Sequence, residues 1–152
     1  MCNDDIIDTL NKLIETSKDG EYGFHASAEY LKDPGTKQSF ERRAEECRQA
    51  AGELQALVVR FGGSAEDGGT AAGALHRGWV AVKGTLAGYT DKAILEETET
   101  GEDSALKTYR EALDEALPPD VRLVVERQYE GVKRNHLQIR TWRDQARAAA
   151  HS

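Results

Sequence analysis

The chain has 152 residues, of which 39% are hydrophobic and 31% charged, and its net charge is −7. This size and composition argue against a disordered chain and predict one domain over residues 1–152. The acidic balance argues against a nucleic-acid partner, and no stretch approaches the roughly 20 apolar residues that a membrane span needs.

The two cysteines, Cys2 and Cys47, are too few for a disulfide framework. They predict two free thiols in a reducing compartment. The first ten residues, MCNDDIIDTL, are acidic and lack the basic-then-apolar order of a signal peptide. We therefore expect a cytoplasmic protein that does not associate with a membrane.

Apolar residues at steps of three and four predict two helices in the first half of the chain, over residues 4–32 and 36–61. Pro34 lies in the short connection between them, which predicts an antiparallel hairpin. The predicted buried seam consists of Ile7, Leu10, Ile14, Ser17, Glu21, Phe24, Ala28 and Leu31 in the first helix, and of Phe40, Ala44, Cys47, Ala51, Leu54, Val58 and Phe61 in the second.

The second half predicts a similar hairpin, with helices over residues 91–116 and 119–149 and Pro118 in the turn. Between the hairpins, residues 62–90 are long enough to run back along a helix of roughly 37 Å. This crossover, which we expect to carry a short helix of its own, predicts an up-down-down-up four-helix bundle. The second predicted seam is Leu95, Thr98, Glu102, Ala105, Tyr109 and Ala112, with Val121, Val125, Gln128, Val132, Asn135, Ile139 and Trp142.

The two hairpins show a weak internal repeat. A shift of 81 positions aligns the pair Gly20-Glu21 with the pair Gly101-Glu102, so each hairpin carries a Gly-Glu pair in the middle of its first helix. Both glutamates fall on the predicted seam. The sequence therefore predicts two inward-facing carboxylates at the same height in the bundle.

Three segments carry a resemblance to a known family. They are LNKLIETSKDGEYGFHASAE near the start, GALHRGW at residues 73–79 and TGEDSALKTY at residues 100–109. With them the chain resembles a bacterial family of ferritin-like four-helix-bundle proteins of unknown function. The resemblance implies a ferritin-like fold and supplies no substrate or catalytic residue.

One interpretation of the seam glutamates is a metal site. Ferritin-like di-iron carboxylate proteins take one Glu from each of two helices and a Glu-x-x-His pair from each of the other two. Here the second helix offers Glu46-x-x-Gln49 and the fourth Lys133-x-x-His136, so the set is incomplete. The candidate ligands for iron or manganese are Glu21, Glu46, Glu102 and His136, with Glu99, Glu130 and Glu53 as alternates.

The other interpretation needs no metal, because a buried carboxylate can be paired within the protein. Folding the hairpins back places Arg48 level with Glu21, and places Arg134, Asn135 and His136 level with Glu102. The two glycines then allow close helix packing. On this interpretation Glu102→Gln leaves a buried cation uncompensated and costs on the order of 3 kcal/mol.

Sequence patterns for a catalytic site are absent: there is no phosphate-binding Gly-rich loop, Cys-x-x-Cys, His-Glu-x-x-His or Gly-x-Ser-x-Gly. We expect a non-enzymatic bundle protein with a role in a stress response, which forms a homo-oligomer such as a dimer or binds a protein partner. The alternative is a di-metal carboxylate protein. Within LHRGW, Trp79 is expected to anchor the crossover, while His76 and Arg77 pair with acidic residues.

Overall fold

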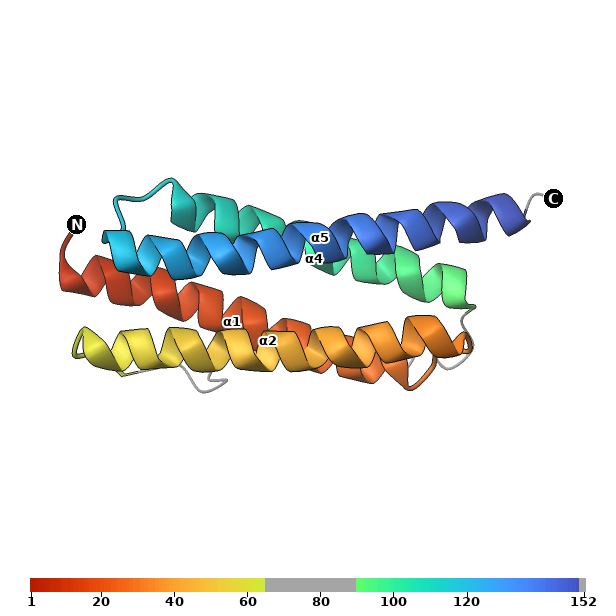
Figure 1. Cartoon of the computed structure of the whole chain (residues 1–152), viewed down its shortest axis with the longest axis horizontal. Helices are drawn as coiled ribbons and strands as arrows, with labels where there is room; N and C mark the ends of the chain where they lie inside the picture. Colours follow the sequence, from red (N-terminus) through yellow and green to blue (C-terminus); the bar gives the residue numbers. More distant parts are fainter. Residues whose placement is uncertain (65–89, 151–152) are drawn as a thin grey trace.

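The computed structural model describes residues 1–64 and 90–150, which form helices α1 (Asn3–Ala28), α2 (Pro34–Arg60), α4 (Asp91–Leu113) and α5 (Pro119–Ala150). The predicted crossover helix and the GALHRGW segment lie outside the described residues. Figure 1 shows α1 and α2 as one antiparallel hairpin and α4 and α5 as another. Because α2 and α4 run in the same direction, the predicted up-down-down-up order is confirmed.

Helix boundaries differ from the predicted ones by a few residues, and local hydrogen bonds explain two of the differences. α2 begins at Pro34, two residues early, because Asp33 caps it by accepting from the Thr36 amide at 2.9 Å and proline is favourable in a first turn. α1 ends at Ala28, four residues early, where the Tyr30 amide turns back to Ser27. α4 ends at Leu113 and α5 begins at Pro119, as expected for the latter.

One side chain ties the two hairpins together at the end of the bundle where α4 begins. The Asp91 carboxylate accepts hydrogen bonds from the backbone amides of Lys32 and Asp33, both at 2.9 Å. These amides belong to the turn between α1 and α2, just before a helix, where they lack intrahelical partners. Asp91 therefore fixes the start of α4 against the α1–α2 turn.

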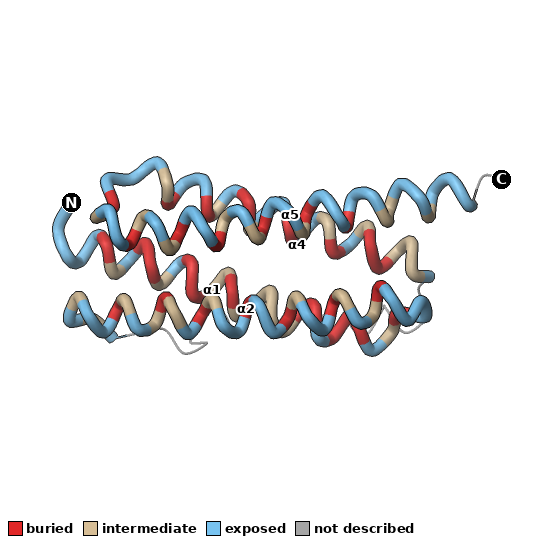
Figure 2. Tube along the Cα trace, in the orientation of Figure 1, coloured by how far each residue is buried: buried red, intermediate tan, exposed pale blue. Residues whose placement is uncertain are grey.

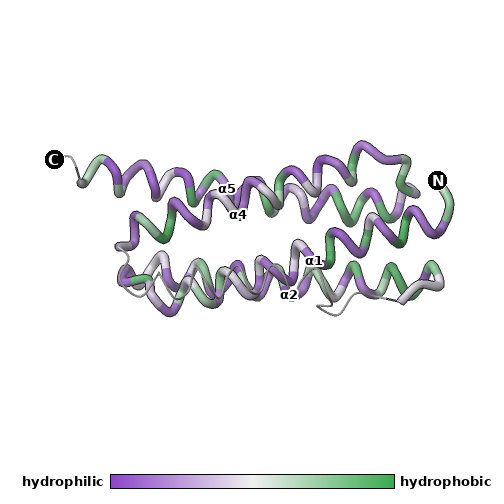
Figure 3. The backbone as a smooth tube through the Cα atoms, turned by 180° about the vertical axis from the view of Figure 1, so that it is seen from behind, coloured by the Kyte–Doolittle hydropathy of each residue, from purple (hydrophilic) through white to green (hydrophobic). Residues whose placement is uncertain are grey.

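The core consists of two apolar clusters, one toward each end of the bundle. Buried residues recur along one side of each helix (Figure 2), and most of the predicted seam is buried. The exceptions are partly exposed, namely Ile7, Glu21, Phe61, Ala105, Asn135 and Trp142. Hydropathy changes from residue to residue along every helix, as expected when one stripe faces the core (Figure 3). The first end cluster contains Ile6, Leu10, Leu13, Ile14, Leu54, Val58, Leu106, Tyr109, Ala112, Leu117, Val121, Val125 and Val132. The second end cluster contains Phe24, Ala28, Leu31, Phe40, Ala44, Cys47, Ile94, Leu95 and Ile139.

None of the described helices is long and apolar enough to cross a membrane. The two thiols are free, as predicted: Cys2 is exposed and Cys47 is buried. The polar residues between the two end clusters, namely Ser17, Arg43, Glu102, Gln128 and His136, are called the polar middle below.

Candidate functional site

Glu102 occupies the centre of the polar middle. The helical period of α4 places Glu102 on the same stripe as the buried Thr98 and Tyr109, so its side chain points toward the core. It is a charged residue on the core-facing side of an amphipathic helix. Only 5% of the residue is exposed, and its Oε2 atom is buried without a hydrogen-bond partner. An unsatisfied buried carboxylate oxygen is costly, so the charges around it decide its state.

Arg43 of α2 is the principal cation near Glu102. Its side chain is 11% exposed, and its Nη1 atom lies 3.2 Å from the Glu46 carboxylate. Burial raises the pKa of Glu102, and the positive charge of Arg43, the Asn135 amide and His136 only partly offset it. Asn135 does so without a well-formed hydrogen bond, because its Nδ2 atom is buried and unpartnered. The centre of the bundle thus holds an acid and a base whose pairing is incomplete.

Gly20 explains one of the two Gly-Glu pairs. A Cβ atom on Gly20 would lie 2.9 Å from the sulfur of Cys47, a separation that packed atoms do not tolerate. The glycine therefore lets α2 approach α1 closely at this height. Burial, with the negative charges of Glu102 and neighbouring glutamates, raises the pKa of the Cys47 thiol to about 12, although the positive charge of Arg43 lowers it. Cys47 is consequently an inert thiol that acts in packing.

Tyr109 satisfies its hydroxyl inside the bundle, as expected for a core tyrosine. It donates to Gln128 Oε1 at 2.9 Å and lies 3.3 Å from the hydroxyl oxygen of Ser17. Gln128 in turn donates to the carbonyl of Ala50 at 3.3 Å. Burial raises the pKa of Tyr109 to about 12, so the phenol stays neutral. This network links α1, α2, α4 and α5 at one height of the bundle.

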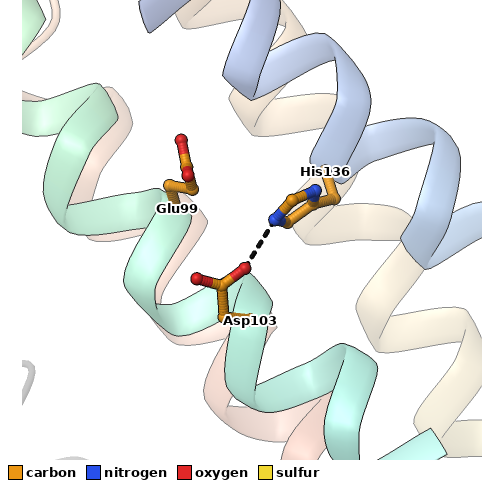
Figure 4. A group of neighbouring side chains, drawn as sticks. All are labelled: Glu99, Asp103 and His136. Carbon is orange, nitrogen blue, oxygen red and sulfur yellow. Dashed lines mark hydrogen bonds and ion pairs between the residues drawn. The ribbon is translucent and has the colours of Figure 1, made fainter. Parts of the chain in front are cut away.

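A second polar cluster lies between α4 and α5 and contains two carboxylates and an imidazole (Figure 4). Glu99 and Asp103 stand one helical turn apart on α4, and His136 faces them from α5. One potential ligand atom from each residue lies within 4.8 Å of the others. The His136 Nε2 and Asp103 Oδ1 atoms are 2.6 Å apart. We call these residues the α4–α5 cluster.

Arg143 closes one side of the α4–α5 cluster. It donates to both carboxylate oxygens of Glu99, and the two side chains are only 17% and 12% exposed. Arg143 also pairs with Asp144 at 2.9 Å. Asp103, by contrast, is 61% exposed, so the opposite side of the cluster faces solvent.

The predicted ligand residues do not gather in one place. Among the residues that the structure describes, the α4–α5 cluster is the group whose ligand atoms are close enough for one ion, and it contains His136 and the alternate Glu99 but not Glu21, Glu46 or Glu102. The other predicted ligands are distributed as follows: Glu46 is exposed and paired with Arg43, Glu53 with Arg127, and Glu130 with Lys133, while Glu21 is half-buried with one unpartnered oxygen. The set of Glu21, Glu46, Glu102 and His136 stays a prediction.

Sequence reasoning missed Arg43, Asp103 and Arg143. Arg43 directly precedes the seam residue Ala44, so a long side chain there can reach inward from the edge of the seam. Asp103 lies four residues after Glu99, and Arg143 lies seven residues after His136. Both spacings place side chains on one face of a helix, a signal that was available in the sequence.

Two cavities flank the polar middle. One, of about 290 Å³, opens between α2 and α5, and the other, of about 350 Å³, opens between α1 and α4. Glu102 lines both of them. Small residues at the same height leave the space unfilled: Gly20 and Ala105 line both cavities, and Gly131 lines the first.

The fold is that of the ferritin-like four-helix bundles. A Mycobacterium smegmatis Dps1 mutant has a similar structure, with a TM-score of 0.74 and 16% identity over 93% of this chain and 96% of that one. The tetragonal form of Mycobacterium smegmatis Dps gives a TM-score of 0.73 and 17% identity over 91% and 86% of the two chains. At such identities the likeness concerns the fold. No curated protein matches the chain.

The chain belongs to the family described as "Domain of unknown function (DUF2383)", whose model matches residues 5–115. This agrees with the resemblance found in the sequence. A ferritin-like fold invites the question of a di-metal centre, and the polar middle does not fit one. Arg43 already supplies positive charge to Glu102, and Glu46, the predicted partner ligand, points to solvent and pairs with the same arginine.

Proposed function

We propose that this protein is a ferritin-like bundle protein that binds one divalent transition-metal ion, iron or manganese, at the α4–α5 cluster. The observation that carries the proposal is the convergence of ligand atoms from Glu99, Asp103 and His136 within 4.8 Å of one another. Two carboxylates and one imidazole form a donor set that suits Fe²⁺ and Mn²⁺. With three protein ligands, water can complete the coordination shell on the exposed side of Asp103.

Arg143 competes with a metal ion for the Glu99 carboxylate. Its guanidinium occupies the Glu99 carboxylate, so a metal ion has to displace a cation. The alternative partner Asp144 lies 2.9 Å from the same guanidinium, which keeps Arg143 paired after Glu99 is released. The site is therefore expected to be of moderate affinity, and removing the competing charge with Arg143→Gln should strengthen binding.

The test uses the full-length, chelator-treated protein and titrates Mn²⁺, with binding followed by the loss of free Mn²⁺ signal in electron paramagnetic resonance. We expect one ion per chain in wild type and at least about tenfold weaker binding in Asp103→Asn, which removes an exposed ligand charge without disturbing the core. Glu111→Gln, an exposed α4 carboxylate outside the cluster, is the charge-matched control. Equal binding by the Asp103 and Glu111 variants would refute the proposal.

A second candidate function is self-association through α5. Leu123 and Leu137 are 67% and 63% exposed, and they lie only about 40° apart around the helix axis because 14 residues nearly complete four turns. Two large apolar side chains on one outward face are suited to packing on a second copy. Light scattering after size exclusion should give a dimer that Leu123→Glu with Leu137→Glu converts to a monomer. Val59→Glu, an exposed apolar position on α2, is the control, and a monomeric wild type would exclude this function.

A further inference from the structure

The outer part of the groove between α2 and α5 collects hydrogen-bond donors. It forms a cavity of about 250 Å³ that continues from the one lined by Glu102, since Arg43, Glu46, Gly131 and Arg134 line both. Arg42 also lines it, so three arginines face one groove in a protein whose net charge is −7. A positively charged groove on an acidic protein favours the binding of an anion.

Two of these guanidinium groups converge on a residue that has no side chain. The position that a Cβ atom on Gly131 would occupy is 3.7 Å from Arg43 Nη1 and 3.7 Å from Arg134 Nη2. Two cations on one small space repel each other, and an anion placed between them relieves that repulsion. The absence of a side chain on Gly131 leaves the space open between them.

Two buried donors in the groove have no well-formed hydrogen bond to any of the described residues. The Nε atom of Arg43 and the Nδ2 atom of Asn135 are both buried without a partner. Arg134 is exposed and forms no ion pair with another described residue. Buried donors are normally satisfied, so an acceptor-rich ligand accounts for this arrangement. The planar guanidinium matches the geometry of phosphate and carboxylate oxygens.

We infer that the groove between α2 and α5 binds a small oxyanion, a phosphate or carboxylate group, between Arg43 and Arg134 with Asn135 as a further donor. The carboxylate of Glu46 is the internal competitor. It lies 3.2 Å from Arg43 Nη1 and is 49% exposed, so it can turn to solvent when the ligand arrives. This site requires no metal and lies outside the α4–α5 cluster, so it is independent of the metal proposal.

The experiment titrates inorganic phosphate, and separately succinate, into metal-free full-length protein in a calorimeter, with sodium chloride added to match ionic strength. At least one of the two should bind with one site per chain. Arg134→Gln should weaken that binding about tenfold, the loss of one charged hydrogen-bond donor. Arg140→Gln, which removes an exposed arginine elsewhere on α5, should change it less than about twofold, since it alters only the long-range charge.

Removing the charge of the competitor Glu46 should have the opposite effect to Arg134→Gln. Glu46→Gln should strengthen phosphate or succinate binding several-fold, because Arg43 loses its internal partner. Glu41→Gln, an exposed carboxylate on α2 outside this groove, makes the same change in net charge and should have little effect. All four substitutions lie at exposed positions, so folding is preserved. The inference is overturned if neither ligand binds wild type beyond the chloride control, or if Arg134→Gln and Arg140→Gln behave alike.

Discussion

The two ends of the bundle are packed with apolar side chains, whereas its polar middle contains buried charged groups and adjoining cavities. Each end is a closed apolar cluster in which residues such as Leu10, Leu54 and Ile94 have no exposed surface. The middle contains Glu102 and Arg43, both with buried atoms that lack a partner, and it is flanked by cavities on both sides. Hydrophobic burial drives folding, so the ends hold the helices together. The middle contributes less to stability and leaves room for ligands.

The largest effect is expected at an end. Leu10→Ala removes a side chain that is fully buried in the first end cluster and leaves a cavity there, at a cost of about 3 kcal/mol in the free energy of unfolding. Urea denaturation followed by circular dichroism measures this cost. Val59→Ala, at an exposed apolar position of α2 that lies outside the proposed α5 contact face, is the control and should stay within about 0.5 kcal/mol of wild type. Similar effects of the two substitutions would contradict the assignment of the ends as the stabilising regions.

The next effect tests the packing at the edge of the polar middle. Gly20→Ala places a methyl group 2.9 Å from the Cys47 sulfur, so a buried contact has to shift and we expect a loss of about 1.5 kcal/mol despite the better helix propensity. Gly52→Ala is the matched control, because no atom lies within 4 Å of its added methyl group, and it should gain about 0.5–1 kcal/mol. Chemical denaturation of both variants gives the comparison, and a stabilised Gly20→Ala protein would show that Gly20 is not needed for close packing.

The ends are also the part of the molecule that the sequence predicts best. Their residues follow the 3.6-residue period without interruption, and prolines separate the helices within each hairpin, so the helices, their order and most buried residues were predictable. Helix ends were predicted less well, because α1 ends by backbone turns at Ser27 that carry no proline or glycine signal.

The sequence predicts where the polar middle lies along the bundle, but it does not predict which of its side chains contact one another. The period shows that Glu102 points inward, which the structure confirms, and Asn135 and His136 are near it as one interpretation expected. It does not show which long side chain reaches Glu102 from another helix. Arg43 reaches the centre because its stem extends past the seam, and that depends on rotamers and on the helix offset, neither of which is encoded in the period.

For Glu102→Gln, the structure predicts a gain in stability, whereas the sequence predicted a loss. Burial outweighs Arg43 and raises the pKa of Glu102, so keeping this carboxyl group in the core costs free energy at neutral pH, where the unfolded chain ionises it freely. Glu102→Gln removes the titrating group, and Arg43 keeps Glu46 as its partner. We therefore expect metal-free Glu102→Gln to be about 1 kcal/mol more stable than wild type in urea at pH 7, where the sequence suggested a loss.

Glu97→Gln, which neutralises an exposed carboxylate on α4, is the control for the change in net charge and should leave stability nearly unaltered. A loss of about 3 kcal/mol in Glu102→Gln would instead show that Arg43 depends on Glu102 for its compensation.

The smallest effect concerns Asp19, which lines the cavity between α1 and α4. Burial, together with the negative charge of Glu15, raises the pKa of Asp19 from 3.8 to about 7. The folded state therefore holds this proton more tightly than the unfolded state. The resulting stabilisation is complete below pH 3.8 and is lost as the pH rises to about 7.

Asp19→Asn mimics the protonated form at every pH. The variant should match wild type near pH 4 and become more stable than wild type by about 0.5 kcal/mol at pH 8, a modest gain because Asp19 is only partly buried and solvent screens its charge. Urea midpoints measured across this range test the prediction, with Asp8→Asn, at an exposed position of α1, as the control. A difference between Asp19→Asn and wild type that does not change with pH would mean that folding does not raise the pKa of Asp19.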